Sequence, residues 1–221
     1  LGADSLCSEC PCIVPCAGGS AEGEADCGVG YVDTTNGGCF AAEPAFSPIT
    51  PGTAVCGTGG AWEEPGGFIA DWDIYEFVLT GSAELHFSVL AEYPVIAAIY
   101  DGTAGCPGEL LSAFADYACD SANATASVGP GTYWMATRVL SSTDESQCGK
   151  RYTALLTVTP IAFGDADGDE DVDLDDYLAL ADCMNGPGAD PTPTPPRTAQ
   201  ECLDAFDSDF DLDVDCEDAA A

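Results

Sequence analysis

Aspartates recur at every second position in two stretches near the C-terminus, and this spacing suits the binding of a hard divalent cation. Ca²⁺ takes about six to eight oxygen ligands, which a twelve-residue loop supplies from its positions 1, 3, 5, 7, 9 and 12. The stretches that follow Gly164 and Phe206 place an aspartate at all of these positions, so we expect two Ca²⁺ sites. The expected ligands are Asp165, Asp167, Asp169, Asp171, Asp173 and Asp176 in the first loop and Asp207, Asp209, Asp211, Asp213, Asp215 and Asp218 in the second, with Asp171 and Asp213 acting through their carbonyls.

Both loops differ from an ordinary calcium loop at the sixth position, where Glu170 and Leu212 stand in place of glycine. The chain turns there with a positive φ that glycine adopts freely. A residue with a β-carbon loses about 1 kcal/mol in this conformation. We expect the departure to weaken each site without abolishing it.

The charge balance is strongly acidic, with 39 Asp and Glu against 4 Lys and Arg and a formal charge of -35. Such a chain repels nucleic acid phosphates and anionic lipids, so neither is expected as a partner. Bound cations would relieve the self-repulsion. A generic acidic surface adapted to high salt is the alternative, which explains the charge but not its spacing. No run of about 18 or more apolar residues occurs, so no membrane insertion is expected.

Thirteen cysteines indicate an oxidising compartment, and we expect a secreted, extracellular or cell-surface protein. The start at Leu1, without Met or an apolar leader, predicts that a signal peptide has been removed. The odd count leaves a thiol free or paired with another chain, and the expected disulfides include Cys183–Cys202 and Cys106–Cys119. The first segment contains seven of the cysteines, which are Cys7, Cys10, Cys12, Cys16, Cys27, Cys39 and Cys56. Zinc binding is the alternative to disulfides for its tight cluster CSECPCIVPC.

Short apolar runs between turn residues predict a mainly β fold. Their spacing favours a β-sandwich over residues 61–160, after a Cys-rich segment (1–60) stapled by disulfides and before a calcium-loop module (161–221). Apolar side chains at helical spacing predict a short helix over residues 175–184. The proline-rich stretch between the loops is expected to be extended, and the three alanines after the second loop are too few for a helix. The expected strands are residues 74–80, 84–90, 94–100, 132–139 and 152–158.

These residues carry two resemblances to known families. DWDIYEFVLT, the run ending in IYDGTAGC, GPGTYWMATRV and YTALLTV together look like the bacterial pre-peptidase C-terminal domain, which implies a non-catalytic, jelly-roll-like β-sandwich. The aspartate-rich stretches resemble a type I dockerin, which implies a compact module of two Ca²⁺ loops, each followed by a helix. EGEADCGVGYVDTTNGGC also looks like the Cys-rich leader that precedes such sandwiches in secreted bacterial proteins.

The dockerin-like stretches depart from the family where dockerins meet their partner. Dockerins present small hydroxyl residues to a cohesin at loop positions ten and eleven, whereas this chain has Leu174-Asp175 and Cys216-Glu217. A helix after the second loop is also missing. The resemblance therefore implies Ca²⁺-dependent structure more than cohesin docking.

The residue types do not favour an enzyme. His86 is the sole histidine, and its alternation with Leu85 and Phe87 points it away from the core. No serine-nucleophile, zinc-protease or phosphate-loop motif accompanies it. The abundant carboxylates stand in the register of metal loops instead of in an apolar pocket that would make one of them an acid.

Other acidic and aromatic residues are weaker candidates. Solvated loop carboxylates are the favoured interpretation of a group of acidic residues, although sandwich domains often hold Ca²⁺ at strand ends. A sugar-stacking platform of Trp62, Trp72 and Trp134 is a further option, although Trp134 fits a core or sheet-surface position better. The acidic residues of this group are Glu22, Glu24, Asp26, Asp33, Asp71, Asp73 and Asp101.

The expected function is that of a secreted structural protein, stabilised by Ca²⁺ and disulfides, that self-assembles into an extracellular filament or matrix. Its partner would be a second copy of the chain, joined by strand addition at an open sheet edge. The alternative is a non-catalytic binding or docking module, either a carbohydrate-binding accessory or a cohesin-type adaptor. In that case the partner is a polysaccharide or an extracellular protein.

Overall fold

The chain forms two compact units. A computed structural model describes residues 14, 16, 18–140, 148–161, 163–166, 172–209 and 211–218. The larger unit, called the sandwich unit below, draws on Leu1–Val78, Leu85–Ala126 and Gly131–Val158. The smaller C-terminal unit is built mainly from Thr159–Ala221, with Leu79–Glu84 and Ser127–Pro130.

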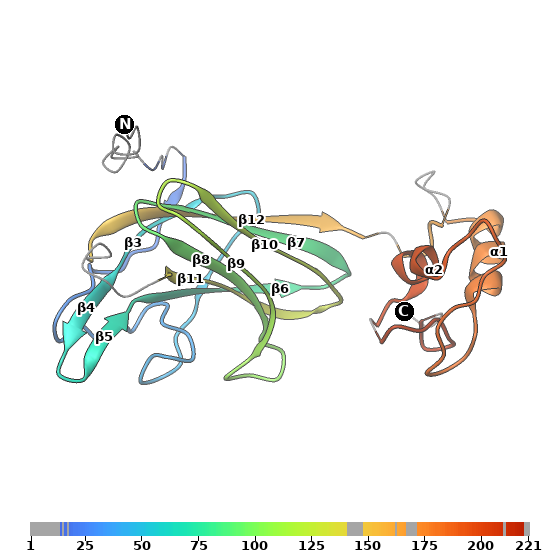
Figure 1. Cartoon of the computed structure of the whole chain (residues 1–221), viewed down its shortest axis with the longest axis horizontal. Helices are drawn as coiled ribbons and strands as arrows, with labels where there is room; N and C mark the ends of the chain where they lie inside the picture. Colours follow the sequence, from blue (N-terminus) through green and yellow to red (C-terminus); the bar gives the residue numbers. More distant parts are fainter. Residues whose placement is uncertain are drawn as a thin grey trace, which may run out of the picture. The chain divides into compact units, whose positions relative to one another are not determined.

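Two five-stranded sheets and a hairpin make up the β structure, which confirms the predicted mainly β sandwich (Figure 1). The short strands β1 and β2 run parallel to β3 and β6, whereas β12 with β3, β11 with β8 and β8 with β9 are antiparallel. The first sheet has the order β1 (Ser20–Ala21), β3 (Val55–Gly59), β12 (Lys150–Pro160), β7 (Ala83–Ala91), β10 (Ser121–Val128). The second has the order β2 (Ser47–Pro48), β6 (Trp72–Leu79), β11 (Gly131–Val139), β8 (Val95–Asp101), β9 (Glu109–Asp116), and β4 (Ala61–Glu64) pairs with β5 (Gly67–Ala70).

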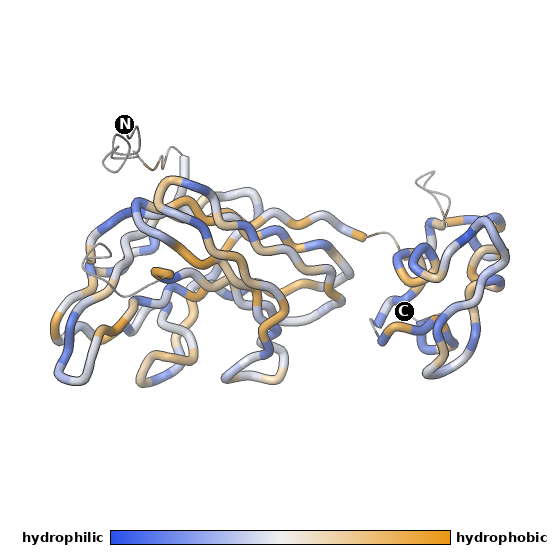
Figure 2. Tube along the Cα trace, viewed as in Figure 1, coloured by the Kyte–Doolittle hydropathy of each residue, from blue (hydrophilic) through white to orange (hydrophobic). Residues whose placement is uncertain are grey.

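Side chains from both sheets form the core of the sandwich. In β7, Leu85, Phe87 and Val89 are fully buried and alternate with less buried residues, as in a strand with one face in the core. Met135 of β11 and Ile99 of β8 are register partners in the second sheet, and both are fully buried. Figure 2 shows the resulting alternation of hydrophobic and hydrophilic residues along the strands.

Disulfides tie the Cys-rich segment to the strands of the sandwich. Cys16 pairs with Cys56, next to the parallel pairing of β1 with β3. The next two cysteines of this segment pair with partners far along the chain, in Cys27–Cys148 and Cys39–Cys106. The segment is therefore stapled within itself by Cys16–Cys56 and tied to the rest of the sandwich unit by the other two bonds.

The expected Cys106–Cys119 bridge is wrong, because Cys106 pairs with Cys39. Cys106 precedes β9 and Cys119 follows it. The eight residues of β9 rise by about 3.3 Å each, so their ends lie roughly 25 Å apart. A disulfide requires Cα atoms within about 7 Å of each other. Cys119 is in a disulfide of its own.

Two helices form in the C-terminal unit. Helix α1 (Leu174–Cys183) confirms the predicted helix and starts at a capping box between Asp173 and Asp176. The sequence analysis did not predict helix α2 (Ala199–Phe206), which directly follows the proline-rich stretch and precedes the second calcium loop. The Cys183–Cys202 disulfide joins the two helices, as predicted. In the part of the chain that the structure describes, no helix has the length and apolar character needed to cross a membrane.

Candidate functional site

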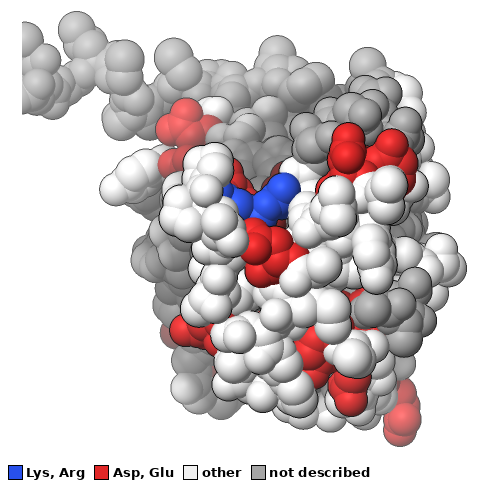
Figure 3. Space-filling model, turned by 90° about the vertical axis from the view of Figure 1, so that its right-hand side faces the viewer, with Lys and Arg blue, Asp and Glu red and all other residues white. Residues whose placement is uncertain are grey.

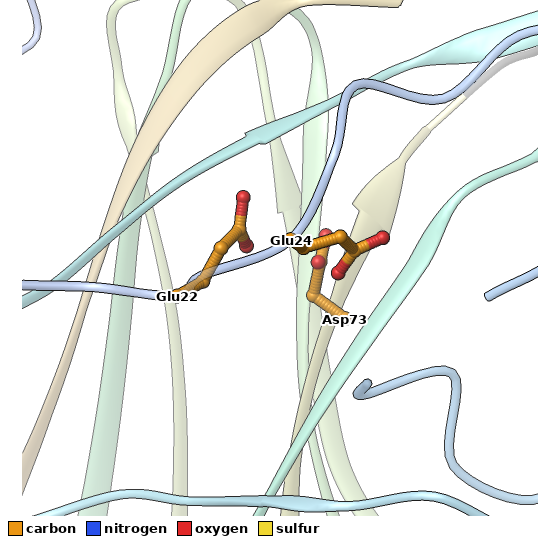
Figure 4. A group of neighbouring side chains, drawn as sticks. All are labelled: Glu22, Glu24 and Asp73. Carbon is orange, nitrogen blue, oxygen red and sulfur yellow. The ribbon is translucent and has the colours of Figure 1, made fainter. Parts of the chain in front are cut away.

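Five carboxylates converge in the sandwich unit and form what is called here the carboxylate cluster. They make two groups of three, in each of which the ligand atoms lie within 4.8 Å of one another, and Glu24 belongs to both. The first group is Glu22, Glu24 and Asp73, and the second is Glu24, Asp33 and Asp71. Figure 4 shows Glu22 and Glu24 on one N-terminal segment and Asp73 on β6. These residues were weaker candidates in the sequence, where solvated loop carboxylates were favoured.

Backbone pairing brings the N-terminal carboxylates to β6. The segment after β1 stays beside β3, because the Glu22 N–H donates to the Cys56 carbonyl at 3.1 Å. The Thr58 N–H donates to Glu22 Oε1 at 2.6 Å. Glu22 and Glu24, like Asp71 and Asp73, are two residues apart, the spacing that puts side chains of an extended chain on one side.

Buried hydroxyl and amide groups hold the inner side of the cluster. The Tyr152 hydroxyl donates to Glu22 Oε2 at 2.6 Å and accepts a hydrogen bond from the Tyr75 hydroxyl, which lies 3.3 Å from the same Glu22 oxygen. The Asn36 side-chain amide donates to Asp73 Oδ1 at 2.9 Å. A β-carbon at Gly57 would clash with Glu22 and Tyr152, so only glycine lets β3 approach this closely.

The carboxylates of the cluster are short of positive charge. An ion pair joins Arg151 to Glu92, which is not a residue of the cluster. Among the described residues, no basic side chain forms an ion pair with a carboxylate of the cluster. Both carboxylate oxygens of Glu24 and one each of Asp33, Asp71 and Asp73 are buried without a hydrogen-bond partner. Buried carboxylates that repel one another are stable only when protonated or bound to a cation.

Burial and this repulsion together raise the pKa values of three carboxylates of the cluster. Burial, and then the charges of Asp71, Asp33 and Glu22, raise the pKa of Glu24 to about 8. Burial, followed by the charges of Asp33 and Glu22, raises the pKa of Asp71 to about 7. The pKa of Asp73 also lies well above its usual range, again because of burial first and neighbouring carboxylates second.

The donor set fits Ca²⁺. All five side chains offer hard carboxylate oxygens, and the groups contain no His or Cys that would favour Zn²⁺ or Cu²⁺. Ca²⁺ tolerates irregular sets of about six to eight oxygens, whereas Mg²⁺ requires near-octahedral geometry and retains water. Because Glu24 belongs to both groups, it could bridge two cations. Glu22 and Asp73 would hold one cation, and Asp33 and Asp71 the other.

The two aspartate-rich loops form the other candidate site. In the second loop, Asp207, Asp209 and Asp218 form one group of potential ligands, and Asp213, Asp215 and Asp218 form another. Asp211 lies outside both groups, and its carboxylate accepts from the Asp213 N–H at 3.2 Å. In the first loop, Asp165, Asp173 and Asp176 are described, and Asp176 is buried. The other candidates of that loop lie outside the described residues, and they are Asp167, Asp169, Asp171 and the neighbouring Glu170.

The described parts of the two loops repeat the same hydrogen bonds. In each loop the carboxylate at position 12 accepts from the N–H groups of positions 2 and 9, and the carboxylate at position 9 accepts from the N–H of position 11. The distances are 2.6, 2.8 and 2.8 Å in the first loop and 2.7, 2.8 and 2.7 Å in the second. The acceptors are Asp176 and Asp173 in the first loop and Asp218 and Asp215 in the second. The register shared in sequence is thus also shared in structure.

Leu212 adopts the backbone conformation expected at position six of the second loop. Its φ is +73°, in the left-handed region, and its N–H donates to Asp207 Oδ2 at 3.1 Å. The pKa of Asp209 is raised, first by desolvation and then by the negative charges of Asp211 and Asp218. Neighbouring aspartates of the loop therefore repel one another. The loop therefore holds a strained residue and repelling charges together.

The other sequence candidates lie outside these sites. His86 is partly exposed on β7 and points away from the core, as predicted. Asp26 accepts from the Thr58 hydroxyl at 2.9 Å, and Asp101 accepts from the Thr103 N–H at 2.7 Å, a bond within a turn. Trp134 is buried and stacks on Phe46, which leaves Trp62 and Trp72 as the tryptophans that line a shared cavity.

Neither a protein-family model nor a curated protein sequence matches the chain. Among solved structures, the pre-peptidase C-terminal domain of a Bacillus anthracis collagenase is similar over 50% of this chain and 93% of its own, with 13% identity and a TM-score of 0.37. A β-1,3-glucan-binding CBM6 from Bacillus halodurans is similar over 46% and 87%, with 14% identity and a TM-score of 0.30. A Cry1Da tryptic core variant of Bacillus thuringiensis is similar over 52% and 25%, with 9% identity and a TM-score of 0.26. The first belongs to the family that the sandwich sequence resembles, but similarities of this strength assign no family, activity or ligand to the chain.

Without Ca²⁺, the stability of the sandwich unit should fall as the pH rises. The raised pKa values of Glu24 (4.5 to about 8) and Asp71 (3.8 to about 7) mean that the folded chain binds more protons than the unfolded chain between roughly pH 4 and pH 8. The free energy of unfolding therefore decreases across this window. Thermal melts in chelator, followed by tryptophan fluorescence, would measure it, since all three tryptophans lie in the sandwich unit. A midpoint that rises from pH 5 to pH 8 would contradict the expectation.

Leu212→Gly should tighten Ca²⁺ binding by the second loop. Glycine relieves about 1 kcal/mol of backbone strain at φ +73°, and the leucine side chain is 67% exposed, so little apolar contact is lost. The gain corresponds to about fivefold in the dissociation constant. Calorimetric titration would measure it against Leu212→Ala, which shortens the side chain but keeps the β-carbon. Equal affinities of the two variants would show that this strain does not limit the site.

Proposed function

We propose that the chain is an extracellular, non-catalytic module whose folded state depends on Ca²⁺ and disulfides. One observation carries the proposal: Asp71 and Asp73 are buried beside the half-buried Glu24, and all three have buried oxygens without a hydrogen-bond partner and no basic ion-pair partner among the described residues. Such a cluster destabilises the fold when it is empty and charged. It stabilises the fold when a divalent cation joins the N-terminal segment to β6.

The cysteine pairing supports an extracellular location. The described disulfides span 40, 121, 67 and 19 residues, and each joins parts of the chain that folding has already brought together. Such bonds persist in oxidising compartments and are rare in the cytosol. Ca²⁺ sites of extracellular modules commonly operate at about 10⁻⁴ to 10⁻³ M, so a site weakened by strain or repulsion is still useful there.

The C-terminal unit has the proposed role of a second, dockerin-like Ca²⁺ module. The repeated hydrogen bonds of its loops support this role, as does its small core around the Cys183–Cys202 disulfide and Val214. Docking to an extracellular protein is the alternative role, which the exposed apolar side chains of Leu174, Tyr177 and Leu178 on α1 favour.

Self-association is the structural role that we propose for the sandwich. Strand β9 lies at the edge of its sheet and exposes Leu110, Leu111 and Phe114, and an apolar edge of this kind can accept a strand of a second copy. Charge opposes the contact: the chain has a formal charge of -35, and on the one face that Figure 3 draws, Asp and Glu side chains (red) surround a small area of Lys or Arg (blue). Bound Ca²⁺ would lower this repulsion, so assembly into a filament or matrix would require the cation.

The central test is the thermal stability of Asp73→Asn with and without Ca²⁺. In the wild type, Ca²⁺ at about 1,000 times its dissociation constant should add roughly 4 kcal/mol to the free energy of unfolding. Asp73→Asn should be more stable than the wild type in chelator, because asparagine is neutral without taking up a proton, and less stable in Ca²⁺, because a carboxylate ligand is lost. Glu84→Gln, on the exposed face of β7, makes the same charge change and should shift neither value. The proposal would be refuted if Ca²⁺ left the melting midpoint of the wild type, followed by tryptophan fluorescence, unchanged.

Self-association has its own test in light scattering. In millimolar Ca²⁺ the mass should exceed that of one chain and should return to it in chelator. Phe114→Asp, which charges the β9 edge, should keep the chain monomeric in Ca²⁺. Tyr117→Asp makes the same change at an exposed residue beyond the strand and should still associate. A wild-type monomer in Ca²⁺ would rule out this role.

A further inference from the structure

A groove of about 450 Å³ opens beside the carboxylate cluster and is called here the aromatic groove. Five aromatic side chains line it, and Asp33 and Asp71 of the cluster form part of its wall. Its volume lies in the range of small-molecule sites, and its lining is mainly apolar with a few polar groups, the composition typical of such sites. The five aromatic side chains are Tyr31, Phe40, Trp62, Phe68 and Trp72.

The rings of the aromatic groove are held in place before any ligand binds. Phe40 stacks on Trp72 with ring centroids 4.3 Å apart and planes at 22°. Tyr31 meets Trp62 edge-on at 5.7 Å, and the Trp62 indole N–H donates to Glu64 at 3.2 Å. Phe40 is nonetheless 63% exposed, so ring surface remains available to a ligand.

Disulfides fix the segment that carries Tyr31 and Asp33. Cys27, before this segment, is bonded to Cys148, and Cys39, after it, is bonded to Cys106. The Gly30 N–H also donates to Glu64 Oε1 at 3.0 Å. A preformed site of this kind loses little conformational entropy when it binds a ligand.

A cation held by the second carboxylate group would lie at the wall of the groove. Asp71 is 3% exposed and its Oδ2 has no hydrogen-bond partner, so an oxygen of this group is buried and free to coordinate. Three carboxylates alone do not reach the usual coordination number of Ca²⁺ unless all of them bind through both oxygens. The remaining positions would be open to oxygens that enter from the groove.

We propose that the aromatic groove binds a neutral oligosaccharide whose hydroxyl groups complete the coordination of this Ca²⁺. The inference rests on the proposed Ca²⁺ binding. The C–H face of a pyranose ring packs on the exposed aromatic surface, and its vicinal hydroxyls are hard oxygen ligands. Among the described residues, no Lys, Arg or His lines the groove, and the nearby Arg138 guanidinium is held over the Trp72 ring, 4.7 Å from its centroid. The formal charge of -35 repels anionic ligands such as phosphates and acidic sugars.

The test is calorimetric titration of the full chain with hexasaccharides of glucose, xylose and N-acetylglucosamine, in millimolar Ca²⁺ and in chelator. At least one hexasaccharide should bind in Ca²⁺ and lose about tenfold or more of its affinity in chelator. Phe40→Ala and Trp62→Ala should each weaken binding by about tenfold while leaving the Ca²⁺-induced rise in melting midpoint in place. Phe114→Ala removes an exposed ring on β9, outside the groove, and should bind like the wild type.

Several results would overturn the inference. They are failure of every hexasaccharide to bind the Ca²⁺-loaded chain, binding that chelator does not weaken, and binding that survives in both groove variants. Capture of an aromatic peptide in place of any saccharide would also overturn it. Ca²⁺ stabilisation without saccharide binding refutes this inference alone, whereas a melting midpoint that Ca²⁺ leaves unchanged refutes the proposed function itself.

Discussion

Repulsion among buried carboxylates is the constraint on which the sandwich unit depends. Glu22 and Glu24 belong to a segment with little regular structure, and Asp73 lies at the start of β6. Without a cation, the fold must hold Glu24 and Asp73 close together as neutral acids, which their raised pKa values express. With a cation, the same oxygens become the link that joins the N-terminal segment to the sheet.

The disulfides and the tyrosine hydroxyls make this arrangement specific. Cys16–Cys56 holds the chain next to β3 just before Glu22, and Cys27–Cys148 holds it again just after Glu24. Glu22 lies between these two anchors, and the Tyr152 hydroxyl, itself bonded to the Tyr75 hydroxyl, orients its carboxylate by donating to it. The disulfides fix the backbone and the hydrogen bonds fix the side chain, so the oxygens that would bind an ion are positioned in advance. The same N-terminal segment also forms one wall of the aromatic groove.

The C-terminal unit positions its clustered carboxylates through local structure. In the described parts of both loops, the carboxylates at positions 9 and 12 accept hydrogen bonds from N–H groups of the same loop, which orders these side chains locally. Helix α1 begins at the end of the first loop and α2 ends at the start of the second, and the Cys183–Cys202 bond joins them. The unit thus needs only a small apolar core, which includes Phe206 and Val214.

Local patterns in the sequence predicted several features. Alternating apolar residues predicted β6, β7, β8, β11 and β12, and helical spacing after the first loop predicted α1. Strand β10 gave no such signal because its buried residues include Ala122 and Ala124, which fit the sandwich only as small side chains. Helix α2 was missed although Thr198 and Glu201 form a capping box, because the prolines before it suggested an extended chain.

The sequence by itself determined the register of the two aspartate loops and the β class, because each depends on residues close together in the chain. Tertiary structure alone decided that Glu22, Glu24, Asp33, Asp71 and Asp73 meet, that Cys39 pairs with Cys106, and that an aromatic groove adjoins the cluster. These features join residues tens of positions apart. The pairing of strands brings such residues together, and no local spacing in the chain encodes it.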